Sequence, residues 1–104
     1  MSEEKIQQLS LIENSLSQIV SQKQQYQKQI MEVDSALGEL KNQKEAYQIV
    51  GTLMIKKDSK DIKNSLEERK NLYESRLDAL EKQESKLKEQ AEKLREELVN
   101  NLEK

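Results

Sequence analysis

Two long apolar seams with alternating three- and four-residue spacing most constrain what this chain of 104 residues can fold into. Ten of the twelve positions in the first seam, and eight of the ten in the second, are apolar or Tyr. A heptad pattern kept over so many turns predicts two coiled-coil helices that bury their seams against each other. The first seam consists of Leu9, Ile12, Leu16, Ile19, Lys23, Tyr26, Ile30, Val33, Leu37, Leu40, Lys44 and Tyr47. The second consists of Leu66, Lys70, Tyr73, Leu77, Leu80, Glu84, Leu87, Ala91, Leu94 and Leu98.

The composition also favours long helices. The chain has no proline, two glycines and 3% aromatic residues, so it lacks the turn residues and large side chains of a sandwich or barrel. We predict a first helix over about 3–47 and a second over about 59–103, the latter starting at a capping sequence around Asp58 and Ser59. Because the connection between the two helices is short, it must reverse the direction of the chain, so the helices run antiparallel. The predicted fold is therefore mainly α, a long antiparallel two-helix coiled-coil hairpin in a single domain over 1–104.

The connection between the helices is the most apolar part of the chain, although a surface turn should be polar. Gly51-Thr52 suits a two-residue type II′ turn, which predicts a short β-hairpin over about 48–57 with strands at 48–50 and 53–56. Both faces of this hairpin would be apolar, and a lone hairpin is marginal in water. We therefore predict that it mediates oligomerisation; the alternative is a plug that caps its own helix pair. The predicted oligomerisation residues are Ile49, Val50, Gly51, Leu53, Met54 and Ile55.

Several functional classes are disfavoured by the residues present. With no Cys and no His, the chain lacks the usual ligands of a zinc site and the usual nucleophile and base pairs, so we expect no enzyme, no metal and no cofactor. Lysines near the connection are interrupted by acids and have no aromatic neighbours for stacking, so we expect no nucleic-acid binding. The longest apolar stretch, 49–55, is too short for a membrane span, and the first residues do not have the layout of a signal peptide.

The sequence around the connection resembles the β-class subunit of prefoldin, a cochaperone of archaea and eukaryotes. The similarity covers nearly the whole chain and lies in a Tyr-x-x-Val-Gly-x-Leu-x-x-Lys connection followed by Leu-Glu-x-Arg and Leu-x-Lys-Gln-Glu in the second helix. A single hairpin fits the β class, because α-class subunits carry two. The matching residues are Tyr47, Val50, Gly51, Leu53, Lys56, Leu66, Glu67, Arg69, Leu80, Lys82, Gln83 and Glu84.

The resemblance implies a function and partners. Prefoldin is a cytoplasmic hexamer of two α-class and four β-class subunits, whose hairpins form a β-barrel platform. Its coiled-coil tips hold unfolded proteins without using ATP, prevent their aggregation and pass them to a group II chaperonin. We therefore expect a holdase subunit with an α-class partner, unfolded clients and a chaperonin partner. The alternative is a structural or tethering coiled coil without clients, which would not need an apolar hairpin.

Surplus apolar residues gather at the two ends of the chain, which an antiparallel hairpin brings together. Ile6, Leu11, Val99 and Leu102 lie off the seams, beside seam residues of the same turns. Helix ends fray readily, so this terminal cluster can open toward an unfolded chain; the alternative is that it only broadens the helix–helix core. The predicted client-binding residues are Ile6, Leu9, Leu11, Ile12, Leu94, Leu98, Val99 and Leu102.

Two charged residues interrupt the seams at positions that should face each other. In an antiparallel pair centred on the connection, facing residues have numbers that sum to about 107, which places Lys23 opposite Glu84. Polar residues inside a coiled-coil seam can set its register at a cost in stability. The alternative is that both charges reach past the seam to water.

Overall fold

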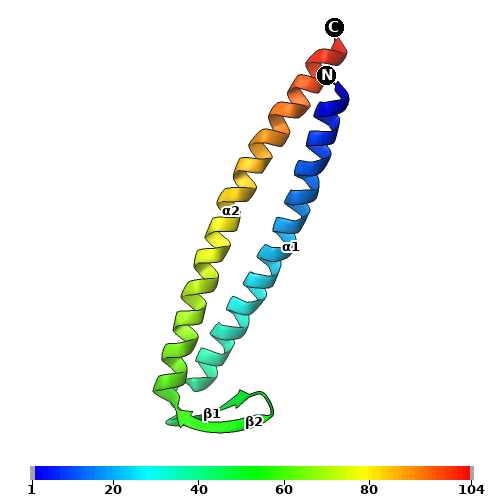
Figure 1. The fold of residues 1–104 in the computed structure, drawn as a ribbon. Helices are drawn as coiled ribbons and strands as arrows, with labels where there is room; N and C mark the ends of the chain where they lie inside the picture. The colour runs from blue at the N-terminus through cyan, green and yellow to red at the C-terminus, as the bar shows by residue number, and fades with distance from the viewer. Residues whose placement is uncertain (1, 104) are drawn as a thin grey trace. The chain divides into compact units, whose positions relative to one another are not determined.

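A long helix precedes a β-hairpin and a second long helix follows it in the computed structural model, which describes the backbone of residues 2–103 and the side chains of residues 2–101 (Figure 1). In chain order the elements are α1 (Ser2–Leu40), β1 (Glu45–Val50), β2 (Leu53–Asp58) and α2 (Ser59–Glu103). Contacts divide the chain into a terminal unit, made of the residues up to Gln25 and from Leu77 onward, and a hairpin unit, Tyr26–Arg76. Segments of α1 and α2 run antiparallel within each unit. That residues 1–104 form a single domain stays a prediction.

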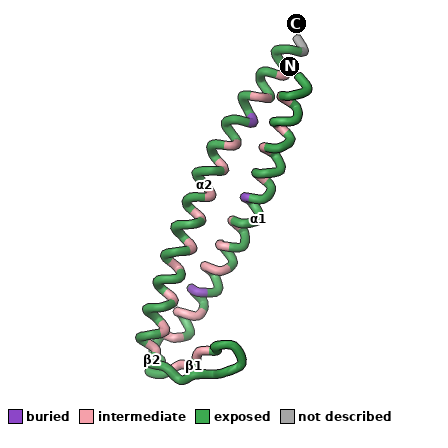
Figure 2. The backbone as a smooth tube through the Cα atoms, in the orientation of Figure 1, coloured by how far each residue is buried: buried purple, intermediate pink, exposed green. Residues whose placement is uncertain are grey.

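The seams account for nearly all of the burial in the helices (Figure 2). Every position of the second seam, and the first ten positions of the first, is buried or half-buried. Ile19 and Ala91 are the most buried side chains in the terminal unit, and Val33 is the most buried in the hairpin unit. The predicted coiled-coil pairing is therefore confirmed as far as Leu40.

The prediction that the first helix continues to about residue 47 is wrong. The helix α1 ends at Leu40, and Asn42 adopts a left-handed conformation with φ of 71°. Asparagine tolerates this conformation better than most residues and commonly follows the end of a helix. The amide of Lys41 donates to the carbonyl of Gly38 at 3.3 Å, and the amide of Gln43 to the carbonyl of Leu40 at 3.0 Å. The last two positions assigned to the first seam, Lys44 and Tyr47, are consequently exposed and not in a helix.

The hairpin forms around the predicted turn but is longer than predicted. Six antiparallel pairs run from Val50↔Leu53 beside the turn to Glu45↔Asp58 at the base. Gly51 has φ of 62° and Thr52 has no positive φ, which fits a type II′ turn and excludes type I′. Both strands therefore have six residues, where three and four were predicted.

Ser59 joins the base of the hairpin to the start of α2. Its amide donates to the carbonyl of Lys44 at 3.1 Å, and its hydroxyl donates to the carbonyl of Gln43. The second helix begins at Ser59 as predicted. The serine hydroxyl bonds to the segment after α1, so these bonds link the first residues of α2 to the loop that ends α1.

The charged pair predicted in the seam is present in the terminal unit. The Nζ atom of Lys23 donates to Oε1 of Glu84 at 3.0 Å, and the two side chains are only 20% and 13% exposed. The prediction that these residues face each other is confirmed. The alternative, in which both charges turn outward to water, is wrong.

The hairpin unit has a different set of contacts between its helical segments. The rings of Tyr26 and Tyr73 are 6.0 Å apart between centroids, and Arg76 Nη1 donates to the Tyr26 hydroxyl at 3.5 Å. The seam residue Lys70 forms an ion pair with Asp34, with 2.7 Å between Nζ and Oδ1. The hydrogen bond to Asp34, reinforced by the charge of that carboxylate, raises the pKa of Lys70 above its ordinary value.

Candidate functional site

The hairpin exposes the apolar side chains that the sequence singled out. Five of the predicted oligomerisation residues have large apolar side chains, and these side chains are between 40% and 69% exposed. Tyr47 is exposed too. They are therefore accessible in the hairpin unit, on a small sheet. We call this set the hairpin surface: Tyr47, Ile49, Val50, Leu53, Met54 and Ile55.

The hairpin surface has two faces because side chains alternate along a strand. The pair Ile49↔Met54 projects to one face, together with Tyr47. The pair Val50↔Leu53 projects to the other face, together with Ile55. A hairpin that plugs its own helix pair would bury the apolar side chains of one face. Both faces keep exposed apolar side chains, so the structure does not support this alternative.

The edges of this small sheet are open as well. The sheet has two strands, so β1 and β2 each present one unpaired edge of amides and carbonyls. Such an edge is a template for a further strand. An ion pair between Lys56 and Glu45, 3.0 Å from Nζ to Oε2, lies at the base with both side chains more than half exposed, where it contributes little to stability. Apolar faces and open edges together make the hairpin suited to protein–protein association.

The terminal unit brings the two ends of the chain side by side (Figure 1). Of the predicted client-binding residues, Ile6, Leu11 and Val99 are more than half exposed. Four others are half-buried in the seam, so they support the helix pair and are only partly accessible: Leu9, Ile12, Leu94 and Leu98. The side chain of Leu102 lies outside the described residues. The sequence therefore identified both exposed apolar residues and core residues as one set.

An apolar groove lies on one flank of the terminal unit. Leu11 and Ile12 of α1 and Leu94 of α2 form its apolar part, and its volume is about 440 Å³. Gln8, Gln90 and Lys93 complete the lining. We call this the Leu11–Leu94 groove. An apolar segment of another chain can reach these side chains without unfolding the helix pair.

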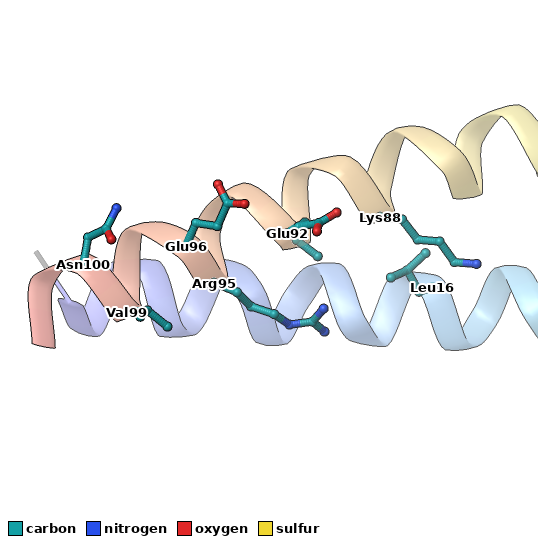
Figure 3. Close-up of a pocket in the computed structure, with 8 residues that line it drawn as sticks. Leu16, Lys88, Glu92, Arg95, Glu96, Val99 and Asn100 are labelled. Atoms are coloured by element: carbon teal, nitrogen blue, oxygen red, sulfur yellow. The ribbon is translucent and has the colours of Figure 1, made fainter. Parts of the chain in front are cut away.

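A second, more polar groove of about 880 Å³ is lined by Leu16 of α1 and by one side of α2 (Figure 3). Leu16, Ala91 and Val99 supply its apolar atoms. Its charged lining includes Arg95, whose Nη2 atom lies 3.0 Å from Oε1 of Glu13. The remaining lining residues are Lys88, Glu92, Glu96 and Asn100.

Neither groove was predicted from the sequence. The signal that was available is Ala91, a small residue at a seam position where leucine is more common in this chain. Ala91 is 1% exposed and is among the lining residues of the second groove only. Gln8, Gln90 and Lys93 gave no signal, because polar residues on a helix flank look like any solvated face.

Two comparisons with known proteins identify the same family. A family model described as "Prefoldin subunit" matches residues 3–104. The crystal structure of the prefoldin beta subunit from Thermococcus strain KS-1 superposes with a TM-score of 0.90 at 32% sequence identity, covering 97% of this chain and 91% of that chain. A comparison with curated protein sequences finds no significant match.

The chain belongs to the prefoldin family. Its similarity to a prefoldin beta subunit, together with one hairpin between two helices, assigns it to the β class. The resemblance inferred from the connection and the second helix is thereby confirmed, as is the predicted fold class. Prefoldins are chaperone subunits, so the hairpin surface and the terminal unit are the parts to examine for assembly and for client binding.

Neither α1 nor α2, as far as the structure describes them, contains a hydrophobic stretch that could span a bilayer.

Proposed function

We propose that this prefoldin subunit acts as an ATP-independent holdase in the cytoplasm. It assembles with an α-class subunit into a hexamer of two α-class and four β-class chains. The terminal units hold unfolded polypeptides, prevent their aggregation and pass them to a group II chaperonin. The protein binds its clients and performs no catalysis.

The hairpin surface supports the assembly part of this proposal. Six apolar or aromatic side chains are exposed on a sheet of two strands, which is unfavourable for a chain that stays alone in water. Pairing with strands of neighbouring subunits satisfies the open edges and covers the apolar faces in one step. A spacer coiled coil without partners has no use for such a surface.

The exposed apolar residues of the terminal unit support client binding, and they are the observation that carries the proposal. Ile6, Leu11 and Val99 have more than half of their surface in water, and Leu11 opens into the Leu11–Leu94 groove. Each apolar side chain buried against a client contributes on the order of 1–2 kcal/mol, so one terminal unit binds weakly. Several units in one oligomer bind the same unfolded chain with a raised effective concentration.

This mode of binding predicts low sequence specificity and weak dependence on salt. Apolar contacts need no fixed hydrogen-bond geometry, and apolar burial is not screened as charge pairs are. An unfolded client offers many apolar segments, so any of them can meet a terminal unit. The client range is then set by exposure of apolar segments and not by a sequence motif.

The test is suppression of aggregation of a denatured client by the assembled hexamer. The variant carries three changes in the terminal cluster, Ile6→Ser, Leu11→Ser and Val99→Ser, all at exposed positions. The matched control removes three other exposed apolar side chains: Val20→Ser, Met31→Ser and Leu72→Ser.

We expect the first variant to assemble normally and to lose most of its protection, while the control protects as the parent does. Equal protection by the parent and the terminal variant would place client binding elsewhere. If the parent binds no client, and neither variant changes the aggregation of the client, the alternative of a tethering coiled coil is favoured.

A further inference from the structure

The ion pair between Lys23 and Glu84 differs from the other ion pairs that join α1 to α2 in the terminal unit. Lys5–Glu97 and Arg95–Glu13 lie at the surface, with side chains from 29% to 57% exposed. Lys23 and Glu84 occupy seam positions and are 20% and 13% exposed. Among these ion pairs, Lys23 and Glu84 are therefore the least hydrated, and each charge is stabilised mainly by the other.

A slide of one helix along the other would separate them. A shift by one helical turn, about 5 Å, moves the facing residue by three or four positions. In one direction Lys23 comes to face Leu80 and Glu84 comes to face Ile19; in the other, Lys23 comes to face Leu87. Ile19 is among the most buried residues of the chain. Each of these slides leaves a charge against apolar side chains without a partner, which is strongly unfavourable.

The apolar seam residues alone do not discriminate between these arrangements so sharply. Leu80 and Leu87 are leucines at equivalent heptad positions of α2, seven residues apart, so one can replace the other against α1. Uniform leucine seams are known to permit alternative registers, whereas a buried polar pair permits one. The charged pair therefore has an effect that a leucine pair at the same place would not have.

We propose that Lys23 and Glu84 are positioning residues that select the register of the terminal unit. In the observed register Leu11 and Ile12 of α1 share a groove with Leu94 of α2. A slide of one turn would carry Leu94 past these residues and dismantle the groove. The consequence for clients rests on the proposed function, whereas the register can be measured on the protein without any client.

The experiment measures the separation of two spin labels attached at Gln22→Cys and Asn100→Cys. Both positions are exposed, and the chain has no cysteine of its own to be labelled by mistake. The two positions are offset along the helices, so a slide of one turn changes their separation by roughly 5 Å. Double electron–electron resonance resolves a change of this size as a second peak or a broadened one.

Three variants are compared with the parent in this labelled background. Lys23→Met with Glu84→Met removes both charges, and Lys23→Glu with Glu84→Lys exchanges them. Lys70→Met is the matched control, because it removes a seam lysine whose partner Asp34 lies in the hairpin unit.

We expect one narrow separation for the parent, the exchanged pair and the control, and two separations for the double methionine variant. The double methionine variant should nevertheless melt at the same or a higher temperature, because apolar replacement of a buried pair removes its desolvation cost. A single narrow separation in the double methionine variant would overturn the proposal. Failure of that variant to fold would also overturn it, because the pair would then supply stability and not register. Two separations in the variant with the exchanged pair would overturn it as well.

Discussion

Replacing Leu53 and Ile55 with aspartate tests whether the hairpin surface holds the oligomer together. The two side chains lie on one face of β2 and are 66% and 40% exposed in the single chain. Aspartate is tolerated there while the chain is alone, because both positions are already in water. In an assembly that buries this face, the same carboxylates lose their hydration without gaining a partner.

The size of the effect follows from the exposed fractions. Full burial of a leucine or isoleucine side chain contributes about 1.5–3 kcal/mol. Scaled by 66% and 40%, the two residues together contribute about 1.6–3.2 kcal/mol per hairpin in the assembly. That loss alone weakens association by about 15- to 200-fold at each hairpin contact. Burial of two aspartates adds several kcal/mol more, so the complex should not form at micromolar concentration.

The assay is the native mass of this subunit mixed with an α-class prefoldin subunit. Circular dichroism of the variant alone should show the parent's helix content, because both residues lie in β2 and neither belongs to a helix. Leu72→Asp is the matched control, since it places the same charge at another exposed leucine, 47% exposed in α2. A Leu53→Asp, Ile55→Asp variant that keeps the mass of the parent complex would refute the assembly role of the hairpin surface.

Three further predictions concern the turn, the end of α1 and a surface ion pair. Asn42→Ala should lower the free energy of unfolding by about 1–2 kcal/mol in urea titrations, because alanine disfavours the left-handed conformation, whereas Asn42→Gly should not. Gly51→Ala should lower the free energy of unfolding by a similar amount, about 1–2 kcal/mol, because alanine disfavours the positive φ at this position. An added Cβ meets nothing within 4 Å, so a steric clash does not contribute. The loss should appear in the same titrations and as a lower yield of complex. The raised pKa of Lys70 favours its charged form in the folded chain, so this stabilisation is complete below the ordinary pKa of 10.5 and is lost as pH rises through the higher folded value. Melting temperatures above pH 10.5 should therefore fall more for the parent than for Asp34→Asn, and equal slopes would contradict this reading.

The heptad pattern predicted the helix pairing as far as Leu40, because residues that recur with this spacing lie on one face of a helix. Lys23 and Glu84 could be placed opposite each other by counting from the connection, and the turn could be placed at Gly51 because only glycine adopts the required φ easily. These features follow from local rules that a sequence states directly. No tertiary information was needed to find them.

The end of α1 was misjudged because two signals overlapped. Lys44 and Tyr47 continue the three-four spacing by coincidence, while Tyr47 and Ile49 also alternate as strand residues do. Asn42 was the deciding residue, and its preference for the left-handed conformation after a helix was available in the sequence. The Leu11–Leu94 groove is a different case, since its lining combines apolar residues with polar flank residues of both helices, and the way these side chains pack is not determined by spacing.

In the proposed function, unfolded clients contact the exposed apolar residues of the terminal unit. The test is site-specific photo-crosslinking in the complex that this subunit forms with an α-class prefoldin subunit, with a photoreactive phenylalanine analogue at position 11, 99 or 72 in turn. Leu11, Val99 and Leu72 are all exposed, so the analogue is tolerated at each and the three differ only in place. We expect a denatured client to be captured at positions 11 and 99 and only weakly at position 72. Capture at position 72 equal to or above that at positions 11 and 99 would contradict it.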